Sequence, residues 1–266
     1  MDPIETIVLA LVQALTEFLP VSSSGHLILI PEFLGWAPSG MAFDVALHMG
    51  TLIAVIAYFR NDVLQLLRAW FTSFGPRKAE AKDARIAWGL GLSVVPASII
   101  GLSMNHLIET HLRSPATVAV MLAVFGVALW LADRWCANRR SFDDLHMGHY
   151  LILGLAQSLA LVPGTSRSGV TMTAARMLGL PRVQAARISF LMAIPVIALA
   201  GTYETIKWAQ APGGVAAADM LLGVAVAAIS GYACIHWFMK LIGRIGFGVF
   251  AIYRLALAAV ILLVLV

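Results

Sequence analysis

Two short polar segments carry most of the residues in this sequence that could do chemistry. The first is Pro20-Val-Ser-Ser-Ser-Gly-His26, and the second is Pro163-Gly-Thr-Ser-Arg-Ser-Gly169. Together they offer hydroxyl groups that can act as nucleophiles, a histidine for proton transfer, and an arginine whose planar guanidinium matches phosphate oxygens. Glu17 adds a carboxylate just before the first segment. This set predicts acid–base chemistry on an anionic, phosphate-bearing ligand.

The rest of the chain has the composition of a membrane protein. Of its 266 residues, 60% are hydrophobic and only 12% are charged, whereas soluble domains carry about a quarter charged residues. A helix needs about 20 apolar residues to cross the hydrocarbon core. Segments of about this length predict six transmembrane helices, at 45–60, 86–104, 116–136, 186–204, 217–239 and 247–265. We therefore expect an all-α polytopic membrane protein that forms a single integral membrane domain over residues 1–266.

The two polar segments lie in the middle of two further apolar regions, 4–36 and 149–180. Proline, glycine and hydroxyl residues interrupt each region, and the apolar pieces on either side are mostly too short to span a membrane. Broken helices at membrane depth occur only where they are buried in protein or line a watery cavity. Both regions are therefore predicted to be re-entrant helix–loop–helix hairpins, each entering and leaving by one face.

The distribution of charge supports this topology. With six spans and two hairpins, fourteen Lys and Arg residues fall on one face and only two, Arg113 and Lys207, fall on the other. Cytoplasmic loops carry the excess of Lys and Arg, so the richer face is assigned to the cytoplasm. If one hairpin alone were a true span, the segregation would be lost. The first hairpin, both termini and Asp44 are then expected on the periplasmic side of a bacterial inner membrane.

The two hairpins have matching spacing. Residues 13–25 and 157–169 each run from a glutamine, past a proline, to a Ser-Gly pair. Each half of the chain holds one hairpin followed by three spans, and an odd number of spans turns the second half upside down. The sequence therefore predicts inverted-topology repeats of about 1–140 and 141–266, an architecture that many transporters build around a central site.

The second half-helix of each hairpin is expected to begin at its polar segment. The free N–H groups and the positive end of the helix dipole would then point into the protein, where such N-termini bind anions. The residues expected to bind a diphosphate there are Ser22, Ser24, Gly25, Thr165, Ser166, Ser168 and Gly169. Arg167 would add a fixed charge. The alternative is that Arg167 ties the two hairpins together, and both roles can hold at once.

The residues expected to take part in catalysis are Glu17, Ser23, His26 and Arg167. Gln13 lies four residues before Glu17 and shares its helix face, so it is a supporting residue. A lone histidine in a helix is often structural, but the neighbouring hydroxyls and carboxylate favour proton transfer by His26. Asp44 and His48, on the next span, are further supporting candidates. For these two, a place in a helix interface or a buried structural hydrogen bond is the alternative.

Two other classes of protein use similar features. A lipid transporter or flippase has inverted repeats and an anion pocket, but it needs no proton-transfer pair, so Glu17 with His26 favours an enzyme. A structural scaffold fits poorly with charges at membrane depth, which are costly. No nucleic-acid partner is expected, because the cations lie in short clusters between apolar runs. Cys136 and Cys234 are isolated and suggest neither disulfides nor a metal cluster.

The two segments resemble the signature motifs of a known family. Gln13-Ala-Leu-Thr-Glu-Phe-Leu-Pro-Val-Ser-Ser-Ser-Gly-His26 and residues 163–169 are similar to those of the bacterial undecaprenyl-diphosphatase family, of the bacitracin-resistance type. The likeness extends to residues 43–50 and 187–192. The resemblance implies a membrane phosphatase that hydrolyses undecaprenyl diphosphate to undecaprenyl phosphate and inorganic phosphate. That reaction recycles the lipid carrier for peptidoglycan synthesis and confers bacitracin resistance.

The resemblance also implies a cofactor and partners. The family is associated with divalent cations, Mg²⁺ or Ca²⁺, for which Glu17 is the candidate metal ligand here. The family motif carries Glu or Gln at the position of Gln13, so this chain lacks a carboxylate pair and Glu17 is the essential acid. The implied partners are a polyprenyl diphosphate lipid and membrane lipid. A second copy of the chain, in a homodimer, is a further candidate partner that the sequence leaves open. A periplasmic opening of the site is implied, whereas a phosphoserine intermediate and direct attack by water both stay open.

Overall fold

The computed structural model describes residues 2–37, 40–75, 81–112, 114–210 and 216–265, and these residues form helices and turns with no strand. The helices are α1 (Pro3–Phe18), α2 (Ser23–Leu34), α3 (Met41–Tyr58), α4 (Arg60–Thr72), α5 (Ala81–His111), α6 (Pro115–Trp135), η1 (Phe142–Asp144), α7 (Met147–Ser158), η2 (Leu159–Leu161), α8 (Arg167–Met177), α9 (Arg182–Gln210), α10 (Ala217–Ile245) and α11 (Gly248–Val264).

Each expected transmembrane segment corresponds to one helix, namely α3, α5, α6, α9, α10 or α11. The all-α membrane class is confirmed. The count of six spans is not, because only four described helices (α5, α6, α9 and α10) are long and apolar enough to cross a membrane by themselves. A fifth is added if α3 and α4, which meet at an angle of 85°, are taken as one span. At 17 residues, α11 is a shorter apolar helix.

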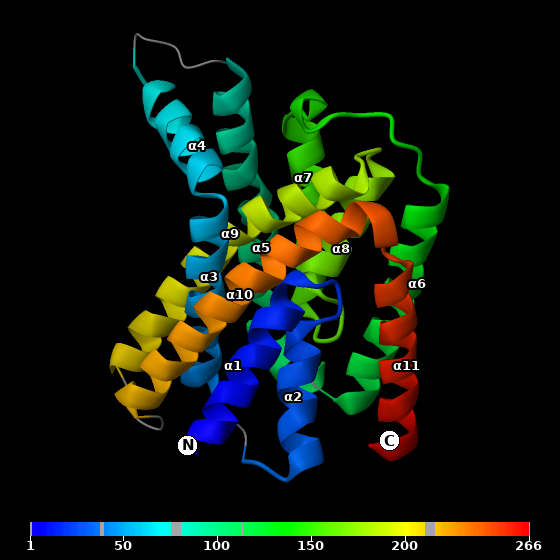
Figure 1. Ribbon diagram of the computed structural model, residues 1–266. Helices are drawn as coiled ribbons and strands as arrows, with labels where there is room; N and C mark the ends of the chain where they lie inside the picture. Colours follow the sequence, from blue (N-terminus) through cyan, green and yellow to red (C-terminus); the bar gives the residue numbers. More distant parts are fainter. Residues whose placement is uncertain (1, 38–39, 76–80, 113, 211–215, 266) are drawn as a thin grey trace.

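The two helical hairpins approach each other from opposite ends of the molecule (Figure 1). From the end that holds both termini, α1 runs inward and α2 returns, whereas α7 enters from the other end and α8 returns to it (Figure 1). Their turns meet inside the protein, where Ser168 Oγ donates a hydrogen bond to the carbonyl oxygen of Leu19 at 3.0 Å. The division into repeats at about residue 140 stays a prediction.

Close helix packing holds the hairpins in place. α10 lies along α1 and α3, α7 packs on α5, and α11 packs on α6. The α3–α10 contact requires a glycine, because a Cβ at Gly50 would lie 2.6 Å from the carbonyl oxygen of Val224. Aromatic rings also pack in the core. Phe18, the last residue of α1, meets Phe190 of α9 edge to face with ring centroids 5.4 Å apart. These contacts make the hairpins part of the packed interior.

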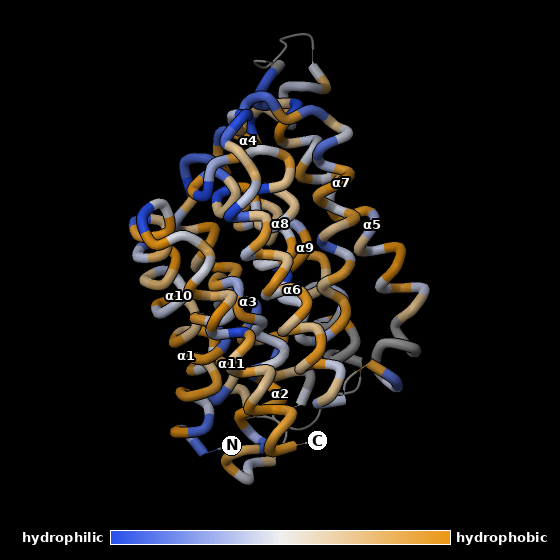
Figure 2. Tube along the Cα trace, turned by 90° about the vertical axis from the view of Figure 1, so that its right-hand side faces the viewer, coloured by the Kyte–Doolittle hydropathy of each residue, from blue (hydrophilic) through white to orange (hydrophobic). Residues whose placement is uncertain are grey.

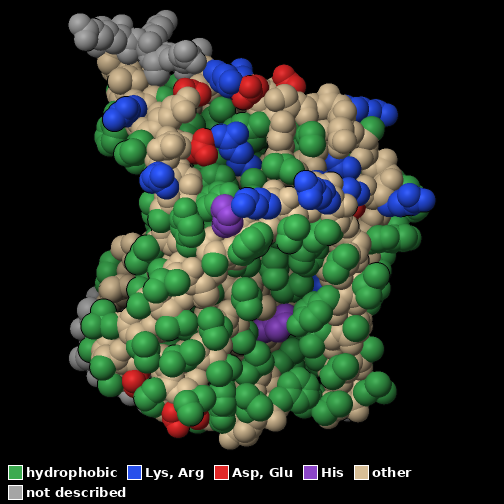
Figure 3. All heavy atoms as spheres, viewed as in Figure 1, with side chains coloured by type: hydrophobic (Ala, Val, Ile, Leu, Met, Phe, Trp, Pro, Cys, Tyr) green, Lys and Arg blue, Asp and Glu red, His purple; other side chains and the backbone are tan. Residues whose placement is uncertain are grey.

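Basic side chains gather at one end of the molecule. In Figure 3 the Lys and Arg side chains lie in the upper part of the face, whereas the lower half is mostly apolar. In Figure 2 the hydrophilic residues likewise concentrate at the upper end of the chain trace. α4 and the connection from α6 to α7 lie at this end, and they carry Arg60, Arg68 and Arg139. Four basic residues of the expected distribution lie wholly or in their side chains outside the described part: Arg77, Lys78, Arg113 and Lys207.

Candidate active site

The two hairpin turns have the same local structure. We call residues 20–26 the first tip and residues 163–169 the second tip. Ser22 and Ser166 precede α2 and α8 with φ angles of 77° and 72°, and they are the positive-φ residues other than glycine in the described chain. Each serine oxygen accepts a hydrogen bond from the glycine N–H three residues later, at 3.4 Å and 3.1 Å. Such backbone strain costs about 1–3 kcal/mol and concentrates at functional sites.

This equivalence aligns the tips residue by residue. Ser23 in the first tip has the same place as Arg167 in the second, since each is the first residue of its helix. Ser24 corresponds to Ser168, and their hydroxyls lie 3.4 Å and 3.2 Å from those of the two capping serines. The two tips are therefore alike in backbone, but one presents a hydroxyl where the other presents a guanidinium.

Glu17 is the centre of the contacts between the tips. Its side chain is only 7% exposed, and Arg167 Nη2 donates to its Oε1 at 2.8 Å. Ser23 Oγ donates to Oε2 at 2.7 Å, and Gln13 Nε2 donates to the same oxygen at 3.2 Å. His48 Nε2 lies 3.6 Å from Oε2. These five residues form what we call the Glu17 cluster.

Arg167 also reaches a third element. Its Nη1 donates to the carbonyl oxygen of Ser189 on α9 at 2.9 Å, and the Ser189 hydroxyl lies 2.7 Å from that of Thr171 on α8. Arg167 thus ties the two hairpins and α9 together, which is the alternative considered from the sequence. It uses only part of its five N–H donors in these bonds. The remaining donors are available to a ligand, whose binding stays a prediction.

His26 does not join the Glu17 cluster. Its Nδ1 lies 2.7 Å from the carbonyl oxygen of Ser22, which can only accept, so Nδ1 carries a hydrogen. Its Nε2 lies 2.7 Å from the hydroxyl of Tyr253 on α11. In the described structure, the hydrogen bonds of His26 therefore go to Ser22 and Tyr253, away from Glu17. The sequence led us to expect a single group of catalytic side chains, and the structure divides it in two.

The other expected residues surround these groups. Ser24 is exposed and Ser23 is partly buried, whereas the remaining expected diphosphate ligands are buried: Ser22, Gly25, Thr165, Ser166, Ser168 and Gly169. The hydroxyl of Thr165 is buried and has no hydrogen-bond partner among the described residues. Asp44 contributes its backbone carbonyl, which accepts a hydrogen bond from His48 Nδ1 at 2.7 Å. This bond orients His48 so that its Nε2 is turned toward Glu17.

Arg254, which was not among the residues expected from the sequence, joins both tips. Its side chain is fully buried. The guanidinium donates hydrogen bonds to the carbonyl oxygen of Pro20 in the first tip, at 3.3 Å, and to those of Gly164 and Thr165 in the second tip, at 3.0 Å and 2.9 Å. It also donates to two carbonyl oxygens of α6. A Cβ at Gly169 would lie 2.8 Å from its Nη1, so the guanidinium lies against the first turn of α8. An arginine inside the apolar segment 247–265 was a signal in the sequence, because charge at that depth is costly. Tyr253 gave no such signal.

A divalent cation was expected only from the family resemblance. In the described residues no group of three or more His, Cys, Asp or Glu side chains could hold a metal. Glu17 is a single carboxylate, and Gln13 Oε1 beside it is buried without a hydrogen-bond partner among the described residues. Mg²⁺ is commonly held by one or two protein oxygens together with substrate phosphates and water. The residues therefore fit a cation only when a phosphate ligand completes its coordination.

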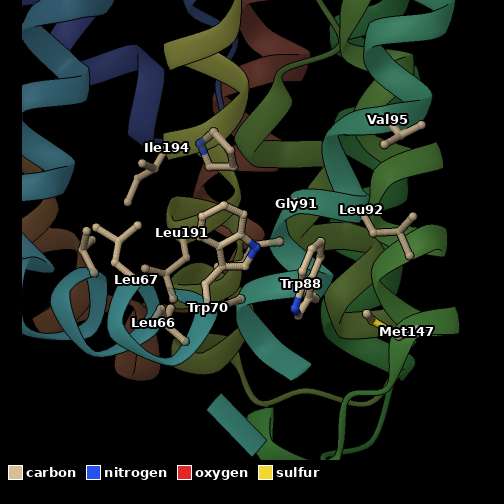
Figure 4. A pocket seen from close by; sticks show the side chains of 14 residues that line it. Leu66, Leu67, Trp70, Trp88, Gly91, Leu92, Val95, Met147, Leu191 and Ile194 are labelled. Atoms are coloured by element: carbon tan, nitrogen blue, oxygen red, sulfur yellow. The ribbon is translucent and has the colours of Figure 1, made fainter. Parts of the chain in front are cut away.

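A separate cavity of about 710 Å³ lies between α4, α5 and α9 (Figure 4). It is lined by apolar side chains such as Trp70, Trp88, Leu191 and Ile194. None of its lining residues belongs to the expected site, and it lacks the few convergent polar groups that bind a charged ligand. This apolar cavity therefore offers no alternative to the tips, and the placement of the chemistry at the tips stays a prediction.

Comparison with known proteins identifies relatives along the whole chain. A family model described as "Bacitracin resistance protein BacA" matches residues 6–260. The chain is 49% identical over 257 residues to "Undecaprenyl-diphosphatase" of Teredinibacter turnerae, covering 97% of both chains. It is 50% identical over 265 residues to "Undecaprenyl-diphosphatase 2" of Stutzerimonas stutzeri, covering 98% of both. Both tips fall within all three matched regions, since each match covers nearly the whole chain.

Proposed function

Because the chain belongs to the Bacitracin resistance protein BacA family, we propose that it is a membrane phosphatase that hydrolyses undecaprenyl diphosphate to undecaprenyl phosphate and inorganic phosphate. This reaction recycles the lipid carrier for peptidoglycan synthesis and gives resistance to bacitracin. One observation carries the proposal beyond the family name: Ser23 Oγ donates to the buried carboxylate of Glu17 at 2.7 Å, and Glu17 is paired with Arg167. A hydroxyl, a base and a guanidinium in contact are the elements of phosphoryl transfer.

The diphosphate binds between the tips in this proposal. The free N–H groups at the start of α2 and α8 and the positive ends of their dipoles face it, and Arg167 donates its remaining N–H groups to phosphate oxygens. Arg254 adds a buried positive charge behind both tips. These groups stabilise the negative charge that spreads over the transferring phosphoryl group. The polyprenyl chain stays among the lipids.

Ser23 is the proposed nucleophile. Its oxygen attacks the terminal phosphorus while its proton passes to Glu17 Oε2, and the bond from that phosphorus to the bridging oxygen breaks. The electron pair leaves with the bridging oxygen as undecaprenyl phosphate. Water then attacks the phosphoserine and releases inorganic phosphate, and Glu17 returns the proton to Ser23.

Glu17 and Gln13 Oε1 would hold a divalent cation together with phosphate oxygens of the bound substrate. Mg²⁺ or Ca²⁺ in that position would add to the neutralisation of the phosphate charge.

The end of the molecule that carries the Lys and Arg side chains is proposed to face the cytoplasm of a bacterium. The first hairpin and the site then open toward the periplasmic side of the inner membrane. Single cysteines test this orientation in a Cys136→Ser, Cys234→Ala background. Ser73→Cys, in the exposed turn after α4, should react with an impermeant thiol reagent only after the cells are opened, whereas Glu32→Cys, near the end of α2, should react in intact cells. Reaction of both in intact cells would contradict the topology.

The central experiment measures phosphate release from undecaprenyl diphosphate by the detergent-purified protein, with and without a chelator. The wild type should release phosphate, and Glu17→Ala should lose this activity while retaining binding of the lipid headgroup. Arg167→Ala should lose both. No release by well-folded wild-type protein across added Mg²⁺ and Ca²⁺ would refute the phosphatase and favour transport of a lipid phosphate by the same anion site.

A further inference from the structure

The hydrogen bonds of His26 determine which of its nitrogens can exchange a proton. Nδ1 donates to the Ser22 carbonyl at 2.7 Å, so in the neutral ring Nε2 has the free electron pair. That nitrogen lies 2.7 Å from the Tyr253 hydroxyl, and the two rings are parallel within 7° with centroids 5.7 Å apart. The Tyr253 hydroxyl is therefore placed to give a proton to Nε2 or to take one from it.

Tyr253 lies where a lipid phosphate can reach it. Its side chain is 45% exposed on α11, although its hydroxyl contacts a histidine that is only 7% exposed. Its neighbours on the outer face of α11 are apolar and more exposed, with Ile252 at 69% and Val249 at 56%. The hydroxyl thus lies at a boundary between the buried tip and a surface suited to hydrocarbon chains.

The Glu17 cluster and the His26–Tyr253 pair lie on different sides of the start of α2. The Glu17 cluster is built by α1, α3 and α8, whereas Tyr253 comes from α11. In Figure 1, α3 and α11 lie on opposite sides of the α1–α2 hairpin. Phosphoryl transfer requires the attacking and the leaving oxygens to be roughly in line across phosphorus. If Ser23 attacks from the Glu17 side, the leaving oxygen lies toward Tyr253.

We propose that Tyr253, together with His26, donates the proton to the leaving lipid phosphate, and that the polyprenyl chain lies along the outer face of α11. This inference rests on the proposed phosphatase activity. As the bond between the terminal phosphorus and the bridging oxygen breaks, the bridging oxygen takes the proton of the Tyr253 hydroxyl. Tyr253 takes the proton of protonated His26 Nε2, which leaves His26 neutral with its hydrogen on Nδ1.

The same pair then serves the second step. Water must attack the phosphoserine opposite Ser23 Oγ, from the side that the lipid phosphate has vacated. Tyr253 takes a proton from this water and passes its own proton to His26 Nε2, which restores the starting state. One pair of residues thus acts as the acid in the first step and as the base in the second, as microscopic reversibility allows.

Tyr253→Phe tests this inference, because it removes one hydroxyl and retains the ring against His26. The kcat for undecaprenyl diphosphate should fall at least about tenfold while KM changes less than about twofold, as expected for loss of a proton-transfer group. His26→Gln in the Tyr253→Phe background should cost little more, because the two residues act as a unit. Tyr232→Phe is the matched control, a tyrosine on α10 that is 40% exposed, and should have the kcat of the wild type.

A wild-type kcat in Tyr253→Phe would overturn the inference while the phosphatase itself stands. The same holds if the reduction in kcat in the double variant equals the product of the reductions in the two single variants. A spectroscopic readout does not depend on activity. In protein with ¹⁵N-labelled histidine, the Nδ1 signal of His26 should be that of a protonated nitrogen, and the Nε2 signal should shift in Tyr253→Phe but not in Tyr232→Phe. An unchanged Nε2 signal in Tyr253→Phe would refute the hydrogen bond and with it the proposed route, even if the wild type proved inactive.

Discussion

Glu17 and Arg167 form a buried ion pair across 150 positions of the chain, with Oε1 and Nη2 2.8 Å apart. Each comes from a different hairpin, and each hairpin enters the protein from a different end (Figure 1). This contact joins the two hairpins through the same carboxylate that accepts a hydrogen bond from Ser23, the proposed nucleophile. Stability and the proposed activity are coupled at this pair.

Removing one member of this pair should destabilise the protein strongly. Arg167→Met leaves the Glu17 carboxylate buried without its cation, and breaking a buried pair in this way costs about 3–5 kcal/mol. Glu17→Gln in the same chain should recover part of this loss, because the uncompensated charge is gone. Thermal unfolding in detergent measures both. Arg187→Met is the control, because Arg187 pairs with Asp62 in a more exposed place and should cost about 1 kcal/mol or less.

Ser23→Ala should abolish phosphoenzyme formation. In the wild type, rapid quenching during turnover of substrate labelled in its terminal phosphate should leave label on the protein, at Ser23. Ser230→Ala is the control, because Ser230 lies on α10 outside both tips and donates its hydroxyl hydrogen to the carbonyl oxygen of Val226. Full activity in Ser23→Ala would eliminate the phosphoserine route and favour direct attack by water.

Replacing a strained capping serine should change stability by an amount that depends on the new residue. Ser166 has a φ of 72° and caps α8 through the Gly169 N–H. Ser166→Ala loses the cap and keeps the strain, so it should lower the free energy of unfolding by about 1 kcal/mol. Ser166→Gly loses the same hydrogen bond but relaxes the backbone, and glycine in a cap costs only a few tenths. Ser166→Gly should therefore be more stable than Ser166→Ala, as measured by thermal unfolding, and equal stabilities would contradict backbone strain at this turn.

The contribution of Arg254 to stability should depend more on the shape of its guanidinium than on its charge. It contacts five carbonyl oxygens, on Pro20, Met121, Leu122, Gly164 and Thr165. Lysine keeps the charge but has only three donors on a flexible stem, so Arg254→Lys should leave several of these oxygens unsatisfied. We expect Arg254→Lys to lose several kcal/mol of stability and to reduce phosphate release. A Lys variant as stable and active as the wild type would mean that charge alone suffices at this position.

The sequence by itself determined the class of the protein and the residues of both tips. Its apolar runs specify membrane helices, because hydrocarbon excludes unpaired backbone groups whatever the tertiary fold. The polar breaks at residues 20–26 and 163–169 marked where helices end and restart, and α2 and α8 do begin inside them. The number of spans could not be read in the same way, since α3 and α4 meet at 85° and the length of an apolar run does not reveal such a bend.

Only the tertiary structure decided which of these residues act together. Glu17 and Ser23 are close in the chain, but the contact of Glu17 with Arg167 and that of His26 with Tyr253 join residues 150 and 227 positions apart. Hydropathy and spacing describe one segment at a time, so they could not separate His26 from Glu17 or reveal Tyr253. The position of Arg254 behind both tips likewise follows from the packing of α11 on α6, which brings one side chain within hydrogen-bond distance of both hairpins.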